Sequence, residues 1–427
     1  MQIIKYPKKE QWKGILKRPD QNNAMIEQSV REILFDVKNN GDKAIKKYTS
    51  ALDGVQLENF ELDKQTIQKA AKKVTPALKT AIKQAADNIT KFHKAQFPKE
   101  IEVEVQPGLI CKQRSVPIEK VGIYIPGGTA PLFSSVLMMA VPAKLAGCKE
   151  IILFTPPKKA GEIDPSILYA ASISGVNKIY QVGGAQAIAA MAYGTETIPG
   201  VDKIFGPGNQ YVTQAKQQVN ASGIAIDMPA GPSEVMIIAD SSASPGLVAT
   251  DLLAQAEHGP DSQVFLLTTD STLPEKVNDK IDKYLQKLSR ADIAKEALNN
   301  SKIIVLNSEE ELMEISNLYA PEHLIIATQP PEELADKVIN AGSVFLGNNA
   351  PESLGDYASG TNHVLPTGGT AKAYSGVSIE TFMKKITFQK ATRDGLKSIS
   401  ETVMTMAETE QLDAHKLAVE VRMNQND

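Results

Sequence analysis

Short apolar segments alternate with helical segments from residue 121 to residue 346, and this alternation limits the possible folds more than any other feature of the sequence. The apolar segments are continuous and rich in β-branched residues, which is typical of strands covered by helices on both faces. Such alternation predicts parallel sheets with right-handed crossovers. A second block of the same kind begins near Ser233, so we predict an α/β protein whose two units meet at a cleft.

The two ends of the chain differ from this central region. Segments 27–47 and 64–96 have apolar residues at helical spacing, and Asn40-Gly41-Asp42 predicts a break between two helices. Apolar and polar residues alternate at the start of 101–116, and the turn signal Pro107-Gly108 follows, which together predict a hairpin. After residue 376 we expect helices to the end, outside any sheet.

Composition excludes several classes of function. The formal charge of −4 is small for 427 residues and gives no nucleic-acid footprint. No apolar run approaches the ~18 residues of a membrane span, and the N-terminus lacks the apolar core of a signal peptide. We therefore expect a cytoplasmic protein. Cys111 and Cys148 form no disulfide framework and no CxxC motif, so two reduced thiols are expected.

The sequence contains only five histidines, and the residues around each of them indicate its role. His93 stands in a lysine-rich amphipathic helix, where packing or solvation is the ordinary role. Gln255 and His258 are three residues apart at a helix end, so they could hold one ion. The alternative is a polar helix terminus whose histidine complements the dipole, since glutamine is an unusual zinc ligand.

Glu322 and His323 stand between a predicted helix and a predicted buried strand. They offer two proton acceptors with different unperturbed pKa values, and histidine near neutrality suits removal of an alcohol proton. An ordinary helix terminus is an equal alternative.

Two polar segments near the C-terminus offer further candidates. We predict that 354–363 is a loop, with Asp356 as a hard carboxylate ligand; a plain surface loop is the alternative. Glu410 and His415 are predicted on the terminal helix, about 140° apart around its axis. They would not hold one ion from one helix face, and a solvated face is the default there.

Three glycine clusters stand at strand-to-helix junctions, at 126–128, 183–184 and 206–208. Each could let backbone amides approach a phosphate at a helix N-terminus, although tight turns are a commoner reason for such glycines. No GxGxxG follows a strand, so the usual dinucleotide fingerprint is missing. Pattern alone does not select NAD.

Taken together, these segments resemble the histidinol dehydrogenase family from about residue 26 to residue 422. The resemblance lies in the ordered motifs 124–132, 182–190, 202–209, 230–234, 255–263, 321–324, 355–357 and 414–415. It implies that Gln255, His258, Asp356 and His415 bind one zinc ion, which holds the imidazole and amino nitrogens of the substrate. It also implies a homodimer in which Glu410 and His415 reach the site of the partner subunit.

The resemblance assigns the remaining roles as well. It implies oxidation of L-histidinol through L-histidinal to L-histidine with two NAD in turn, the last steps of histidine biosynthesis. His323 is implied as the acid–base residue and Glu322 as the residue that activates water. The substrate contacts that it implies are Ser233, Gln255, His258, His323, Asp356, His363, Glu410 and His415. The implied NAD contacts are Tyr124, Gln186 and Asn209. A glycine often seen in the family shortly before the terminal histidine is here Gln411.

We accordingly predict two Rossmann-like, doubly wound parallel-sheet domains with small helical N- and C-terminal extensions. The first domain, 21–123 with 234–377, is expected to be catalytic and to bind the metal. The second, 124–233, is expected to contact NAD. Residues 1–20 form the N-terminal extension, and 378–427 form the C-terminal one, which contacts the partner subunit.

Two other classes of function compete with this hypothesis. A zinc hydrolase would use Glu322 to activate water without NAD. A binding protein would keep the fold without activity, but it would be expected to lose the base and the metal ligands first. All of the implied site residues are present in this sequence.

Overall fold

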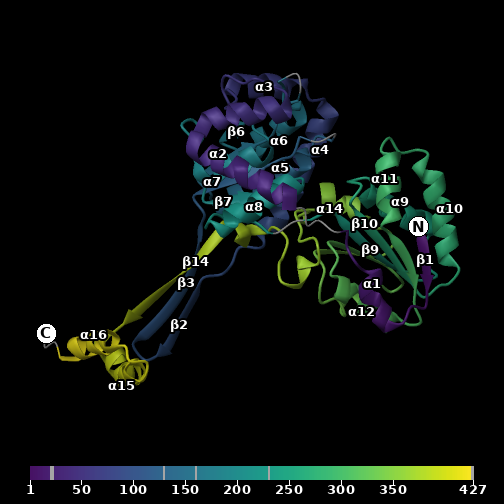
Figure 1. The fold of residues 1–427 in the computed structure, drawn as a ribbon. Coiled ribbons are helices and arrows are strands. Elements are labelled where there is room, and N and C mark those ends of the chain that lie inside the picture. Colours follow the sequence, from purple (N-terminus) through teal and green to yellow (C-terminus); the bar gives the residue numbers. More distant parts are fainter. Residues whose placement is uncertain (20–23, 128–129, 159–160, 229–230, 425–427) are drawn as a thin grey trace.

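The computed structural model describes residues 1–19, 24–127, 130–158, 161–228 and 231–424, and the statements below concern these residues. They form two parallel-sheet units and a projecting arm (Figure 1). Gly128, Thr129 and Ala230 of the sequence motifs lie outside the described residues.

The first unit is built on a five-stranded parallel sheet of order β6-β5-β4-β7-β8. Its strands are β4 (Lys120–Tyr124), β5 (Glu150–Phe154), β6 (Lys178–Tyr180), β7 (Lys203–Phe205) and β8 (Ala225–Ile226). Its crossover helices are α5 (Phe133–Ala146), α6 (Pro165–Ser174), α7 (Gly184–Tyr193) and α8 (Gln210–Ala221). The chain proceeds from β4 to β6 and then returns to the other side of β4, so the strand order reverses between β4 and β7.

Helices from the N-terminal part of the chain cover both faces of this sheet. They are α2 (Ala24–Tyr48), α3 (Lys64–Lys73) and α4 (Pro76–Lys94), and a π-helical turn (Thr49–Asp53) follows α2. Val37 of α2 packs in the same cluster as Tyr180, and Ile89 of α4 in the same cluster as Ile123. The predicted break in α2 is confirmed, because Gly41 has a non-helical φ of 49° and ψ of −129°.

This packing differs from the predicted domain division, which grouped 21–123 with 234–377. In the structure, α2, α3 and α4 lie on the five-stranded sheet (Figure 1). The amphipathic pattern of a helix shows that it has an apolar face. It does not show which of two sheets that face covers.

The second unit is built on a six-stranded parallel sheet of order β1-β11-β10-β9-β12-β13, reversing between β9 and β12. Its strands are β1 (Gln2–Lys5), β9 (Glu234–Ala239), β10 (Gln263–Thr268), β11 (Lys302–Val305), β12 (His323–Ala327) and β13 (Ser343–Leu346). Its helices are α1 (Lys9–Ile15), α9 (Pro245–Ala256), α10 (Leu273–Leu285), α11 (Ala291–Asn299), α12 (Glu309–Tyr319), α13 (Glu332–Ala335) and α14 (Glu352–Tyr357). The segment 1–20 was predicted as an extension, but its strand β1 is instead an edge strand of this sheet and pairs with β11.

The arm is a three-stranded antiparallel sheet of order β14-β3-β2 with two helices at its far end (Figure 1). Its elements are β2 (Ile101–Gln106), β3 (Leu109–Pro117), β14 (Met383–Ala391), α15 (Arg393–Thr409) and α16 (Asp413–Asn424), with 3-10 turns at Thr370–Lys372 and Ile379–Phe382 before β14. The predicted hairpin is confirmed as β2 and β3. The prediction that the chain is helical and outside any sheet after residue 376 is wrong, because β14 pairs with β3 along its whole length.

The strand β14 was missed because it has no buried face. Eight of its nine residues are exposed and one is half-buried, so the alternation that a packed core imposes on a strand is weak there. Within the described residues, no helix combines the length and hydropathy that a bilayer span requires.

Candidate active site

A cavity of about 670 Å³ lies between the two parallel-sheet units. On the side of the five-stranded sheet it is lined by Pro126, which follows β4, and by the loop 206–209, which follows β7. On the side of the six-stranded sheet it is lined by Ser233, which precedes β9, and by Glu322 and His323 at the start of β12. The cavity therefore joins the carboxyl ends of the strands of one sheet to the amino ends of the strands of the other.

Glu322 and His323 are buried, with 6% and 4% of their surfaces exposed. A carboxylate oxygen of Glu322, Oε2, accepts a hydrogen bond of 2.8 Å from the backbone N–H of Glu234. His323 Nδ1 lies 3.7 Å from the same Oε2, and His323 Nε2 lies 3.7 Å from Asp356 Oδ1. The predicted acid–base pair is thus held against the first residue of β9.

Burial determines the protonation of this pair. It raises the pKa of Glu322 well above its usual range, because the charged carboxylate loses its hydration. The same desolvation lowers the pKa of His323 to about 3. His323 is therefore a neutral imidazole at physiological pH and can accept a proton.

Two predicted zinc ligands, His258 and Asp356, lie close together with Glu352, which was not predicted. One donor atom from each of these three residues lies within 4.8 Å of the others. Gln255, in the last turn of α9 and 1% exposed, donates from Nε2 to Glu352 Oε2 at 3.1 Å in the orientation that satisfies its amide. The structure thus gathers Gln255, His258 and Asp356, and it adds Glu352 to them.

Sequence reasoning missed Glu352 because it treated 354–363 as a loop. That prediction is wrong for the first part of the segment: α14 runs through Tyr357, so Glu352 and Asp356 stand four residues apart on one helix. Their i, i+4 spacing would have linked them if a helix had been predicted. Burial raises the pKa of Glu352 well above its usual range and that of Asp356 to about 6.

Ser233 and His363 line the same cavity. His363 connects the two units: its Nε2 lies 3.0 Å from Ser135 Oγ on α5, and its Nδ1 lies 2.7 Å from the carbonyl oxygen of Asp356. Burial lowers the pKa of His363 to about 4, so this ring is also neutral.

Of the three implied NAD contacts, Tyr124 is the last residue of β4, Gln186 lies in the first turn of α7, and Asn209 precedes α8 and lines the cavity. Tyr124 and Gln186 are buried beside the start of α7, with 3% and 0% exposed. The Tyr124 hydroxyl accepts from the Gly184 N–H at 3.0 Å. Gln186 Nε2 donates to Asp53 Oδ2 at 3.3 Å.

Asn209 belongs to a loop that is held at both ends. Its Oδ1 accepts from the N–H groups of Tyr211 and Val212, each at 3.1 Å, and so caps α8. Beneath the loop, Lys216 Nζ lies 2.5 Å from Asp227 Oδ1, and both side chains are buried. Asp227 in turn accepts from the Gly206 N–H at 2.8 Å.

Glu410 and His415 lie on the arm and not at the cavity. The prediction that they share one helix is wrong, because α15 ends at Thr409 and His415 belongs to α16. Gln411, between the helices, has a left-handed φ of 59°. Both helices lie at the far end of the arm from α14 (Figure 1), so a single chain does not bring these residues to the other ligands.

The remaining histidine, His93, and the two cysteines do not line the cavity. His93 is fully buried, with Nδ1 2.9 Å from the Ile89 carbonyl oxygen and Nε2 3.3 Å from Asn362 Nδ2, which confirms a packing role. Cys111 and Cys148 are both free thiols, as predicted.

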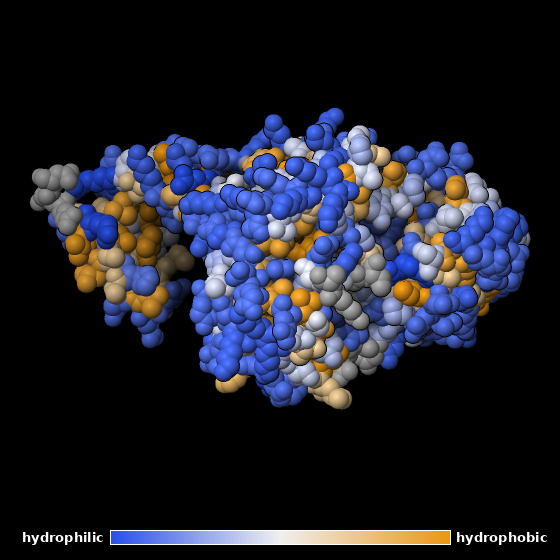
Figure 2. Space-filling model, turned by 90° about the horizontal axis from the view of Figure 1, so that it is seen from above, coloured by the Kyte–Doolittle hydropathy of each residue, from blue (hydrophilic) through white to orange (hydrophobic). Residues whose placement is uncertain are grey.

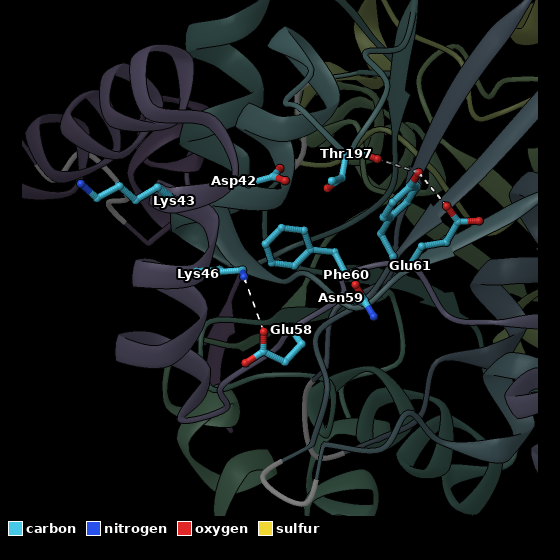
Figure 3. Close-up of a pocket in the computed structure, with 9 residues that line it drawn as sticks. Asp42, Lys43, Lys46, Glu58, Asn59, Phe60, Glu61 and Thr197 are labelled. Carbon is cyan, nitrogen blue, oxygen red and sulfur yellow. Dashed lines mark hydrogen bonds and ion pairs between the residues drawn. The ribbon is translucent and has the colours of Figure 1, made fainter.

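A second hollow, of about 650 Å³, opens on the five-stranded unit between α2 and the segment 58–61 (Figure 3). Its charged side chains are of both signs, and Lys46 Nζ lies 4.0 Å from Glu58 Oε2. It contains none of the residues that the sequence predicts for the site.

Comparison with known proteins decides the family. Residues 16–423 match the histidinol dehydrogenase family. A histidinol dehydrogenase from Bacteroides thetaiotaomicron is 56% identical over 424 residues, 99% of each chain. This chain belongs to the histidinol dehydrogenase family. A histidinol dehydrogenase from Aliivibrio fischeri is 51% identical, covering 96% of this chain and 93% of its own.

A solved structure extends the same result to the fold. The crystal structure of histidinol dehydrogenase from Elizabethkingia anophelis has a TM-score of 0.97 and 52% identity, covering 99% of this chain and 98% of its own. The fold expected from the resemblance is therefore confirmed over almost the whole chain.

Proposed function

We propose that this member of the histidinol dehydrogenase family oxidises L-histidinol through L-histidinal to L-histidine with two NAD in turn, in the last steps of histidine biosynthesis. The observation that carries the proposal is the buried pair Glu322 and His323, at a cavity that also holds the donor groups of His258 and Asp356. Relatives of nearly the same length that are named histidinol dehydrogenase support the choice of substrate.

His323 takes the proton of the alcohol while the hydride of the same carbon passes to NAD, which gives the aldehyde. The neutral ring that burial maintains has a nitrogen lone pair for this proton. Both His323 and the neighbouring Glu322 are buried, which limits the access of bulk water to the aldehyde at this part of the cavity.

Glu322 serves the second oxidation. In its ionised form it removes a proton from the water that adds to the aldehyde, and the resulting hydrate anion passes its hydride to the second NAD, which leaves the carboxylic acid. Burial favours the neutral carboxyl group, and the hydrogen bond from the Glu234 N–H opposes this effect and stabilises the ionised form.

We propose one zinc ion per subunit, bound by Gln255, His258 and Asp356 of one chain and by His415 of the partner subunit. The donor set fits, since histidine nitrogen and carboxylate oxygen are ordinary zinc ligands and those of His258 and Asp356 lie within 4.8 Å. The amide nitrogen of Gln255 donates to Glu352, so the carbonyl oxygen of Gln255 is the atom that would bind the ion. Bound zinc supplies a positive charge that holds the imidazole and amino nitrogens of the substrate.

For NAD, we propose the carboxyl edge of the five-stranded sheet, with Tyr124, Gln186 and Asn209 as contacts. Support comes from the position of the cavity at the carboxyl ends of β4 and β7, where the strand order reverses. Doubly wound sheets bind nucleotides at such a reversal.

We propose a homodimer in which the arm of each subunit reaches the cavity of the other and brings Glu410 and His415 to the substrate there, beside Ser233 and His363. Helix α16 buries none of its residues within the chain. Apolar side chains lie exposed on the arm, at the left of Figure 2; they include Phe388, Leu417 and Val421. A partner subunit would cover them. The cytoplasm remains the expected compartment, with neither nucleic acid nor membrane as a partner.

The decisive experiment supplies L-histidinol and NAD to zinc-replete protein and follows NADH absorbance together with histidine. We expect two NADH for each histidine. Zinc-dependent hydrolysis without NADH would favour the hydrolase instead. Binding of histidinol with no product of either kind would favour the binding protein.

The shared site has its own test. His323→Asn and His415→Ala variants should each be inactive, but if the arms are exchanged, both damaged groups of a mixed dimer lie in one site and the other site is intact. Refolding them together in equal amounts should restore about a quarter of wild-type activity, because half of the dimers are mixed and each of these has one intact site. No recovery from a demonstrably mixed dimer would contradict the exchange of arms.

A further inference from the structure

The buried carboxylate of Glu234 is bound by a residue far away in the sequence. Glu234 begins β9, and its side chain is 3% exposed. Arg18 donates two hydrogen bonds to it, from Nε to Oε1 at 2.5 Å and from Nη2 to Oε2 at 2.9 Å. A paired guanidinium and carboxylate of this geometry fix direction as well as charge.

Arg18 is itself held in place. Its Nη2 donates to the carbonyl oxygen of Tyr319 at 2.8 Å, and the guanidinium lies 3.8 Å from the centroid of the Tyr319 ring. The Gly368 N–H donates to Glu234 Oε1 at 3.2 Å. The carboxylate thus ties the N-terminal segment and the loop at 368 to the start of β9.

The backbone of Glu234 touches both members of the acid–base pair. Its N–H donates to Glu322 Oε2 at 2.8 Å, and its carbonyl oxygen lies 3.3 Å from His323 Nδ1. A displacement of this one residue would therefore turn both groups.

We propose that Arg18 and Glu234 are a positioning pair that sets the orientation of Glu322 and His323. Arg18 does not touch the reacting atoms; it acts through the carboxylate of Glu234 and the backbone of the same residue. Without Arg18, a carboxylate almost fully removed from water would lose its compensating charge, and such a group moves toward solvent or takes up a proton. The proposal rests on the proposed function of Glu322 and His323.

The test compares Arg18→Met and Arg18→Lys with wild type in steady-state oxidation of histidinol and of supplied histidinal, well below the melting temperature of each protein. Arg18→Met should lower kcat at least about tenfold on both substrates while KM stays within about threefold, since binding and chemistry are separable. Arg18→Lys keeps the charge but cannot make two parallel contacts, so its kcat should be intermediate. Lys9→Met, which breaks an exposed ion pair with Glu314 in the same N-terminal segment, is the matched control and should leave kcat unchanged.

A lower melting temperature with wild-type kcat in both Arg18 variants would overturn the proposal and leave a purely structural ion pair. If Arg18→Met does not fold, wild-type kcat in Arg18→Lys alone would overturn it. Wild-type protein that forms no NADH from histidinol would instead contradict the proposed function, so the two failures are distinguishable.

Discussion

The two parallel-sheet units present opposite edges of their sheets to one cavity. The five-stranded unit uses the carboxyl ends of β4 and β7, through Pro126 and the loop 206–209. The six-stranded unit uses the amino ends of β9 and β12, through Ser233, Glu322 and His323. Only the first follows the usual rule for doubly wound sheets.

The difference follows from the direction of the helices. In a parallel sheet the crossover helices run against the strands, so helix N-termini lie at the carboxyl edge and helix C-termini at the amino edge. The five-stranded unit therefore presents a positive helix end, α8, at the loop of Asn209, which favours phosphate. The six-stranded unit presents the negative end of α9, where Gln255 and His258 stand, which favours a cation.

The strongest test of this difference between the two sheets replaces His323 by Asn. The variant should keep histidinol binding but lose about 10²–10⁴-fold in kcat, because a general base is worth that much. Binding by calorimetry and turnover by NADH absorbance measure the two effects. Unchanged kcat would remove His323 from the chemistry.

A smaller and more selective loss is expected for Glu322→Gln. The amide can still accept from the Glu234 N–H, so the fold should survive, but it cannot take a proton from water. Oxidation of supplied histidinal should fall about 10²-fold, while the first half-reaction, followed by single-turnover NADH formation from histidinol, falls far less. Equal impairment of both steps would contradict separate roles for Glu322 and His323.

The sequence predicts which residues belong to this site better than it predicts the elements and contacts that hold them there. Periodicity gave the alternation of strands and helices, because each buried strand needs a continuous apolar run. It could not assign α2 and α4 to a sheet, and it missed β14, which buries no face. Local spacing left the role of Gln255 and His258 open; the family resemblance brought them together with Asp356, and Glu352 emerged only from the structure. The Arg18 contact to Glu234 spans 216 positions, and no local pattern records it.

The carboxyl edge of the five-stranded sheet is tested by Asn209→Ala. Loss of the α8 cap should cost about 1 kcal/mol of stability and disturb the backbone that faces the cofactor. We expect KM for NAD to rise about tenfold with kcat within about threefold, because binding is affected more than chemistry.

Ser308→Ala is the matched control for Asn209→Ala. Ser308 caps α12 in the six-stranded unit by accepting from the Glu311 N–H at 3.4 Å. A similar loss of stability is expected, on the order of 1 kcal/mol, with KM for NAD unchanged. If both variants raised KM equally, the effect would be one of general stability, and the assignment of NAD to the loop of Asn209 would fail.

The smallest effect is expected in the arm, at Gln411→Gly. Gln411 has a φ of 59° between α15 and α16, a conformation that costs a residue with a Cβ about 1 kcal/mol. Glycine removes that cost, so the urea midpoint should rise at a fixed protein concentration. Gln286→Gly is the control, since Gln286 follows α10 with an ordinary right-handed φ of −64° and should lose stability. If stability rises and activity is kept, the turn alone, and not the Gln411 side chain, would present His415 to the proposed shared site. If stability rises and activity falls, the Gln411 side chain would have a part in that site.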